Sequence, residues 1–371
     1  MEDKTLKQKY IDKYFWFLKE RDTANSFNKS SDLNSYHQSE IGTAQRHFED
    51  VEVTVSHLYR EAHPALGGLS YGGQLYRKLN EIRKISASQV IVEVGGGLGY
   101  LAYSFMNQFR ADNAGARAPE YVFCDLTLPF VENQRKLNKA GSIFYCQANA
   151  ETMPFQDCST DLIIDNENIA DFTPVKLNKK IVLDFLNGRL DASLPNDGLV
   201  RKSLQWIKLG QIDVSDAMPE FVFNYGAAEF IGEIKRVLKK DGIAFISEYG
   251  ILQDYPTAVC LHGHVEYNIQ FTHLIKIAKA LGMSVELLSL LDFLGFDADT
   301  EVIDQCSLKY LCVLLKEKGV ELPYLAYTKK MLEERFPGFI DHVQGLIFHK
   351  ISEYSVFHDL KSFHVLLIAK N

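Results

Sequence analysis

The stretch VEVGGGLGY at residues 92–100 decides the fold of this chain. The β-branched residues 90–92 lead into it, and apolar residues at helical spacing follow at 101–109. This pattern predicts a strand, a glycine turn and a helix; glycine suits a turn that takes positive φ and lets a ligand approach closely. A G-x-G-x-x-G fingerprint would need its last glycine at position 100, where this chain has Tyr100. The glycines instead follow a Glu-x-Gly-x-Gly-x-Gly spacing that begins at Glu93.

Length and charge limit the class of protein. The chain has 371 residues, of which 46% are hydrophobic and 24% are charged, so it can bury a large core. It carries 40 Lys and Arg against 48 Asp and Glu, a formal net charge of −8, and its basic residues form only short pairs. We therefore expect no nucleic-acid partner.

Cysteine spacing and apolar runs indicate the compartment. The six cysteines show no Cys-x-x-Cys spacing, which favours buried thiols in a reducing environment. The chain begins MEDK, without the apolar region of a secretory signal, and has no run of about 18 apolar residues. These features predict a cytoplasmic protein without membrane association.

Strand and helix patterns alternate from residue 88 onward. Seven strands are expected, at residues 88–94, 121–126, 142–147, 161–165, 243–248, 284–291 and 363–369. Helices are expected at 230–239 and 271–281. Such alternation predicts an α/β fold with a Rossmann-like, seven-stranded, mostly parallel sheet and helices on both faces.

The remaining segments complete the expected domain organisation. Residues 1–85 are predicted to form a helical N-terminal region. Within it, residues 1–20 are amphipathic and either pack on the main domain or act as a lid. Residues 86–371 are predicted to form the main domain, with insertions at about 172–220 and 297–350. Long insertions of this kind are often functional caps.

The strand ends supply candidate ligand contacts, because ligands of open parallel sheets gather beyond the carboxyl ends of the strands. Asp125 ends the second predicted strand. A carboxylate at this place can accept hydrogen bonds from both hydroxyl groups of a ribose. The alternative is an exposed acid without a ligand.

The turn at 93–99 resembles the first motif of class I S-adenosylmethionine-dependent methyltransferases, whose backbone lies against the methionine part of the cofactor. Residues 149–155 resemble the family's acid-Ala-acid-x-x-Pro-Phe segment, which borders the adenine, although Asn149 replaces the first acid. Residues 236–242 resemble the family's passage from a helix into the fifth strand. The resemblance implies S-adenosylmethionine as cofactor. It implies cofactor-binding roles for Glu93, Gly95, Gly97, Gly99, Asp125, Leu126, Asn149, Ala150 and Asn166.

Further details resemble the MidA-like methyltransferases, which include mitochondrial assembly factors that methylate protein arginine. The matching segments are LTLP at 126–129, QRKL at 134–137, NENIAD at 166–171, YG at 249–250 and FTHL at 271–274. The family's Thr-x-His-Val-Asp-Phe element reads EYNIQF at 266–271, so Asn268 and Gln270 replace its His and Asp. This resemblance implies a protein acceptor as an alternative to a small molecule.

The chemistry of methyl transfer selects candidate catalytic residues. In-line displacement requires the acceptor atom about 3–3.5 Å from the methyl carbon, and an oxygen or carbon acceptor also needs a base. We expect Glu167, after the fourth strand, to face the acceptor; Tyr249, after the fifth, either walls the pocket or packs in the core. His264, within HGHVE at 262–266, is the candidate acid/base histidine. That cluster could instead hold a divalent ion, but its spacing matches no defined metal signature, so we expect no metal.

The sequence therefore predicts an S-adenosylmethionine-dependent methyltransferase that acts on a small-molecule acceptor. The two added segments at 1–85 and 172–220 motivate this prediction, since such additions can enclose an acceptor. A MidA-like protein arginine methyltransferase is the first alternative. A non-catalytic, cofactor-binding assembly partner is the second.

Overall fold

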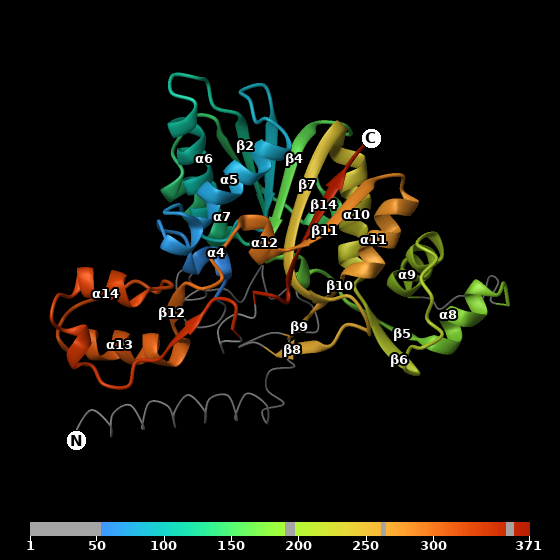
Figure 1. Cartoon of the computed structure of the whole chain (residues 1–371). Helices are drawn as coiled ribbons and strands as arrows, with labels where there is room; N and C mark the ends of the chain where they lie inside the picture. The colour runs from blue at the N-terminus through green and yellow to red at the C-terminus, as the bar shows by residue number, and fades with distance from the viewer. Residues whose placement is uncertain (1–52, 190–196, 261–264, 354–359) are drawn as a thin grey trace.

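The computed structural model describes residues 53–189, 197–260, 265–353 and 360–371, and a central sheet dominates them (Figure 1). Along one path the strand order is β3-β2-β1-β4-β7-β14-β11, and the short β10 (Ile269–Gln270) also pairs with β7. The bounds are Ile143–Gln147, Glu120–Asp125, Val90–Val94, Thr160–Asn166, Leu238–Ile251, Phe363–Ala369 and Ser284–Ser289, in that order. The predicted Rossmann-like, mostly parallel sheet is confirmed among the described residues, with β10 as an eighth strand beside the seven predicted ones.

Pairing directions divide the sheet into two parts. β1, β2, β3, β4 and β7 pair in parallel, whereas β14 runs antiparallel to both β7 and β11. The β7 strand is longer than the predicted 243–248, because its first residue pairs with β4 and its last pairs with β10. A strand's bounds depend on its pairing partners, which a local pattern does not contain.

Helices cover both faces of the sheet, and each face has its own core (Figure 1). One face carries α5 (Tyr71–Ile82), α6 (Tyr100–Asp112) and α12 (Leu290–Leu294); the other carries α10 (Tyr225–Val237), α11 (Phe271–Ala280) and, further out, α9 (Gly198–Leu209). Within β1, Ile91 packs into the first core and Val92 into the second. Side chains of a strand alternate between faces, so unbroken apolar strands fill both cores.

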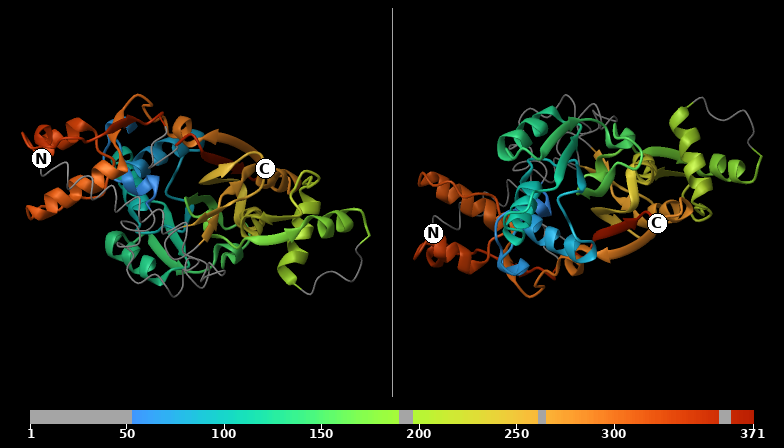
Figure 2. Two further views of the ribbon diagram at one scale, coloured as in Figure 1. Left: turned by 90° about the horizontal axis from the view of Figure 1, so that it is seen from below. Right: turned by 90° about the horizontal axis from the view of Figure 1, so that it is seen from above.

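Two additions extend the molecule at opposite ends (Figures 1 and 2). The first contains β5 (Val175–Asn178), α8 (Lys179–Leu186), α9 and β6 (Glu220–Phe223), and β5 pairs with β6. The second contains β12 (Glu301–Ile303), α13 (Gln305–Glu317), α14 (Lys329–Arg335), η6 (Ile340–His342) and β13 (Phe348–Lys350). These strand pairs, and the pair of β8 (Ala258–Cys260) with β9 (Val265–Tyr267), were not predicted, since three or four residues are too few for a periodic pattern.

The described part of the N-terminal region contains α4 (Val55–Leu58), η3 (Pro64–Leu66) and α5. It is bonded to the second addition: Ala326 N donates to Leu58 O at 3.0 Å, and Asp297 N donates to Ala65 O at 2.8 Å. The amphipathic helix predicted at 1–20 lies outside the described residues. Among the helices that are described, none has the length and apolar character needed to cross a bilayer.

Candidate functional site

Two adjoining cavities open at the carboxyl edge of the sheet, beyond β1 and β4. Strands β2 and β3 lie on one side of β1, and the chain then crosses over so that β4 pairs with β1 on its other side. The strand order therefore reverses between β1 and β4, which is the switch point of the sheet. The larger cavity has a volume of about 640 Å³ when the open space at its mouth is included. Both cavities are lined by Thr54, Gly95, Gly97 and Glu167.

Each of the nine residues predicted to bind the cofactor lines one of these cavities. The larger is lined by Asp125, Leu126, Asn149 and Ala150, the smaller by Glu93, Gly99 and Asn166, and both by Gly95 and Gly97. These residues come from four strand ends that the parallel sheet brings to one edge. The fold therefore brings together residues that are up to 73 positions apart, from Glu93 to Asn166.

The glycine turn has positive φ at all three motif positions, with +60° at Gly95, +49° at Gly97 and +83° at Gly99. A Cβ atom at Gly95 would lie 2.1 Å from Cγ of Asn168, so this glycine makes room for a protein side chain. Asn168 in turn donates through Nδ2 to Oδ2 of Asp165 at 3.0 Å. The sequence analysis attributed the glycines to positive φ and to the approach of a ligand, and it gave Asn168 no role, because a contact between two strand-end loops has no local signal.

Asp125 is held in place by its neighbours and is only 3% exposed. Its Oδ1 accepts from Thr127 N and its Oδ2 accepts from Gln134 Nε2, both at 2.9 Å. The same Gln134 Nε2 donates to Gly97 O at 3.0 Å. Gln134 lies on α7 (Leu128–Leu137) and thus joins the strand-end acid to the glycine turn, which fixes the orientation of both.

Asn149 begins the short helix η4 (Ala150–Thr152). Its Oδ1 accepts from Glu151 N at 2.8 Å, so the oxygen expected to contact a base also caps this helix. Glu151 accepts from both N and Oγ1 of Thr173 through Oε1, each at 2.7 Å. The second acid of the Ala-Asn-Ala-Glu segment therefore ties the loop after β3 to the loop after β4.

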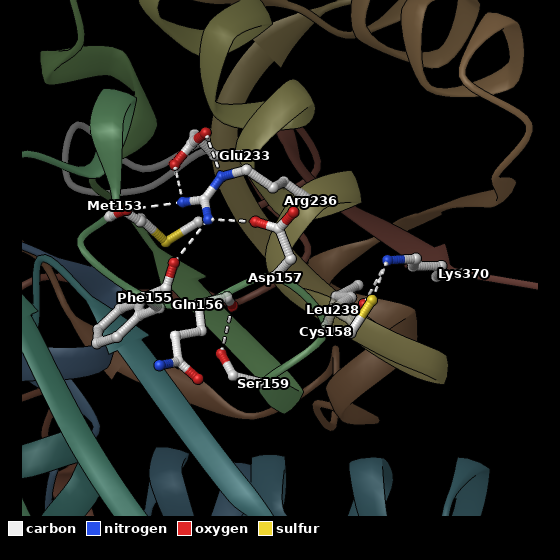
Figure 3. A network of polar contacts seen from close by, with 10 residues as sticks. All are labelled: Met153, Phe155, Gln156, Asp157, Cys158, Ser159, Glu233, Arg236, Leu238 and Lys370. Atoms are coloured by element: carbon white, nitrogen blue, oxygen red, sulfur yellow. Dashed lines mark hydrogen bonds and ion pairs between the residues drawn. The ribbon is translucent and has the colours of Figure 1, made fainter.

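Arg236 holds the turn that follows η4 (Figure 3). Its guanidinium donates to the carbonyl oxygens of Met153 at 2.7 Å and Phe155 at 2.6 Å. It also contacts both carboxylate oxygens of Glu233, at 2.9 and 2.6 Å, and Asp157 Oδ1 at 2.9 Å. A planar guanidinium suits this set because its five donors are fixed in direction. Arg236, the first residue of the 236–242 segment, thus fixes the loop that follows Asn149 through hydrogen bonds to its backbone.

Asn166, at the end of β4, bonds to the N-terminal region. Its Oδ1 accepts from Tyr71 Oη at 2.5 Å and from Ser247 Oγ at 3.3 Å, and its Nδ2 donates to Ser56 Oγ at 3.1 Å. Tyr71 is fully buried. These contacts place residues 53–71 against the strand ends, which sequence patterns did not predict.

Glu167 also faces the N-terminal region. Its Oε2 accepts from Val55 N at 2.7 Å, and its Oε1 accepts from Ser56 N at 3.0 Å and from Asn166 Nδ2 at 3.0 Å. Burial raises the pKa of the Glu167 carboxyl, while the hydrogen bonds from Ser56, Val55 and Asn166 oppose that rise. Glu167 lines both cavities, and its carboxylate is already bonded to three donors.

The other two predicted catalytic residues lie elsewhere or outside the described residues. Tyr249 is 39% exposed, packs edge-on against the Phe363 ring at 5.9 Å, and lies outside the sets of residues that line the two cavities. His264 lies outside the described residues. Among the described residues, no group of three or more His, Cys, Asp or Glu side chains could hold a metal ion.

Three buried carboxyl groups lie on the neighbouring strands β1, β4 and β7, and one of them, Glu93, lines the smaller cavity. Burial raises the pKa of Glu93 to about 8, although Tyr121 Oη donates to its Oε2 at 2.9 Å. Burial likewise raises the pKa of Asp165 to about 7 and raises that of Glu248 well above its ordinary value. Without a ligand, these groups therefore tend to keep their protons near neutral pH. A cationic ligand group, such as a sulfonium or an ammonium, would favour their ionised forms.

We expect Glu93→Gln to weaken the pH dependence of stability. The Glu93 pKa rises from 4.5 to about 8 on folding, so between these values the unfolded chain has lost the proton that the folded chain keeps. The free energy of unfolding should therefore fall as pH rises through this window and level off above it. Gln removes this contribution and keeps an oxygen for Tyr121. Urea unfolding of the ligand-free wild type and of Glu93→Gln at pH 5, 6, 7 and 8 measures how the free energy of unfolding depends on pH. The same pH dependence in both proteins would contradict a buried, protonated Glu93.

Comparisons with known proteins find similarity at the level of fold. Neither the family models nor the curated protein sequences match this chain. An uncharacterized protein from Burkholderia thailandensis is 14% identical over 93% of each chain, with a TM-score of 0.49. Phosphoethanolamine N-methyltransferase 2 of Haemonchus contortus, solved with S-adenosylmethionine, is 12% identical over 92% of this chain and 60% of that one, with a TM-score of 0.42. The [4+2]-cyclase SpnF is 11% identical over 80% of each chain, with a TM-score of 0.39.

Similarities this distant do not assign a substrate, so the class of protein follows from the sheet and the site. The fold is a Rossmann-like α/β fold with a cavity at the carboxyl edge of its sheet.

Proposed function

We propose that this chain transfers a methyl group from S-adenosylmethionine. One observation carries the proposal: the glycine turn, the buried Asp125 and the Asn149-Ala150 pair all line one cavity. Gly95 and Gly97 would lie against the methionine part, Asp125 would accept from the ribose hydroxyls, and Asn149 would border the adenine.

The chain's own contribution would be to position the acceptor. The bound cofactor supplies an activated methyl group, so the protein must align an acceptor atom with it and exclude water. Thr54, Ser56, His57 and Glu167 line the smaller cavity together with the glycine turn. We take these side chains as the groups that would face an acceptor.

A small molecule is the acceptor that we propose. The cavity lining supports this, because Thr54 from the N-terminal region and Glu167 from the end of β4 both line the two cavities, and small molecules bind in concave sites of this kind. The proposal extends to acceptors whose reacting atom is oxygen, nitrogen or carbon.

A protein arginine side chain is a second candidate, and one observation favours it. Glu167 and Asp171 line the same cavity, and paired carboxylates can orient a guanidinium through two-pronged hydrogen bonds. A third candidate, a cofactor-binding assembly partner without catalysis, would use the same cavity.

Calorimetry and a methyl-transfer assay test these candidates in sequence. S-adenosylhomocysteine should bind with one site per chain, and the absence of binding would overturn the proposal. Labelled S-adenosylmethionine is then offered with small amines, phenols and carboxylates, and separately with an arginine-containing peptide. Label on a small molecule supports the first candidate, and label on the peptide selects the second. Binding without transfer to any acceptor selects the third.

A further inference from the structure

The Glu167 carboxylate joins the end of β4 to the start of α4, which is far away in sequence. Its partners Val55 and Ser56 precede it by 112 and 111 residues. It accepts the backbone N–H groups of Val55 and Ser56, the first two residues of α4, at 2.7 and 3.0 Å. Asn166 strengthens the same junction through Nδ2, which donates to Ser56 Oγ at 3.1 Å. The start of α4 is therefore bonded to the end of β4 at the edge of both cavities.

The other end of α4 is bonded to the second addition. Ala326 N donates to Leu58 O at 3.0 Å, and Arg60 Nη1 donates to the carbonyl oxygens of His57 and Tyr324, both at 2.7 Å. The α4 segment thus bridges the second addition and the sheet. On the sheet side, the first two backbone N–H groups of α4 donate to Glu167.

The Glu167 backbone fits a residue held for its position. Its φ is +55°, in the left-handed region that residues with a side chain rarely adopt, and its N–H donates to Ser247 O at 2.8 Å. Such a conformation persists only where the surroundings fix it, and it is found most often at functional sites.

We propose that Glu167 is a positioning residue, whose carboxylate fixes the start of α4 so that Thr54 and His57 complete the wall of the cofactor cavities. Thr54 lines both cavities and His57 lines the smaller one, so their places depend on where α4 begins. The inference rests on the proposed function for its ligand. It assigns Glu167 to binding rather than to proton transfer.

Val55→Pro tests the bond without changing Glu167. Proline lacks the N–H that donates to Oε2, and it is tolerated at the first position of a helix. Thr54 has φ −93° and ψ 153°, the extended conformation that a residue before proline needs. Val55 is fully buried, so Val55→Ala is the matched control: it removes side-chain contacts and keeps the N–H. Glu167→Gln attacks the same bond from the other side, because it removes the charge and turns one acceptor oxygen into a donor.

Calorimetry with S-adenosylhomocysteine should show that Val55→Pro and Glu167→Gln each raise its Kd about tenfold, while Val55→Ala raises it about threefold or less. The double variant Glu167→Gln/Val55→Pro should bind no more weakly than the weaker single variant, since both changes break one junction. Equal Kd values for Val55→Pro and Val55→Ala would overturn the proposal. An unchanged Kd for Glu167→Gln, which a role in proton transfer alone predicts, would overturn it as well.

Amide hydrogen exchange separates this inference from the proposed function. In the ligand-free wild type, the amides of Val55 and Ser56 should be protected, and Glu167→Gln should remove that protection while the amides of β1 stay protected. If the wild type does not bind S-adenosylhomocysteine, the proposed function fails, and exchange still decides whether Glu167 holds α4. Fast exchange of both amides in the wild type, or equal exchange in Glu167→Gln, would refute the junction.

Discussion

Gly97→Val is expected to abolish binding of S-adenosylhomocysteine. Gly97 has φ +49° and lines both cavities. A β-branched side chain strongly disfavours this backbone conformation, and its methyl groups would project where the turn must lie close to the ligand. Calorimetry should detect no heat of binding at ligand concentrations that saturate the wild type.

Gly115→Val is the control for backbone strain. Gly115 has φ +80°, and a Cβ atom there would meet nothing within 4 Å. This variant carries comparable strain away from the site and should bind S-adenosylhomocysteine as the wild type does. If Gly97→Val bound as well as Gly115→Val, the glycine turn would not be a wall of the cofactor site.

Asp125→Ala is expected to weaken S-adenosylhomocysteine binding by about 1–3 kcal/mol, the scale of lost hydrogen bonds to a charged group. This corresponds to a rise in Kd of roughly fivefold to 150-fold. The side chain is buried at the end of β2, and its removal would also leave Thr127 N and Gln134 Nε2 without this acceptor. Gln134 would then hold the glycine turn less firmly, which adds to the loss.

Glu120→Ala is the matched control for Asp125→Ala. Glu120 is the first residue of the same strand, at the opposite edge of the sheet, and it is exposed. It should leave the affinity for S-adenosylhomocysteine unchanged. A wild-type affinity in Asp125→Ala, or an equal loss in Glu120→Ala, would remove Asp125 from the ribose site.

The strands of the sheet could be predicted because each is marked by a short run of apolar and β-branched residues. The β-branched run before Glu93 and the last strand at 363–369 are both apolar on two faces, which is what strands covered by helices require. The order of the strands could not be read in this way. For example, β14 is last in sequence but lies between β7 and β11, because pairing joins segments without regard to their separation along the chain.

The cofactor-side residues could be predicted for a related reason. Each of them follows a strand in sequence, and parallel strands end at one edge, so sequence position alone places Asp125 and Asn149 near the glycine turn. The partners of these residues could not be predicted. Arg236 reaches Met153 from 83 positions away, and Val55 reaches Glu167 across 112.

The sequence by itself determined the alternation of strands and helices, the glycine turn and the acids that follow the strands, since each is a local pattern of residue types. Only the tertiary structure decided that Gly95 must also admit Asn168, and that the Glu167 carboxylate is bonded to the start of α4. The physical reason is that a backbone preference acts over a few residues, whereas a hydrogen bond or a close contact depends on where distant segments pack. Residues 92–100 are therefore enough to predict the side of the site that would bind the methyl donor. The other wall, formed by Glu167 and the start of α4, depends on how distant segments pack.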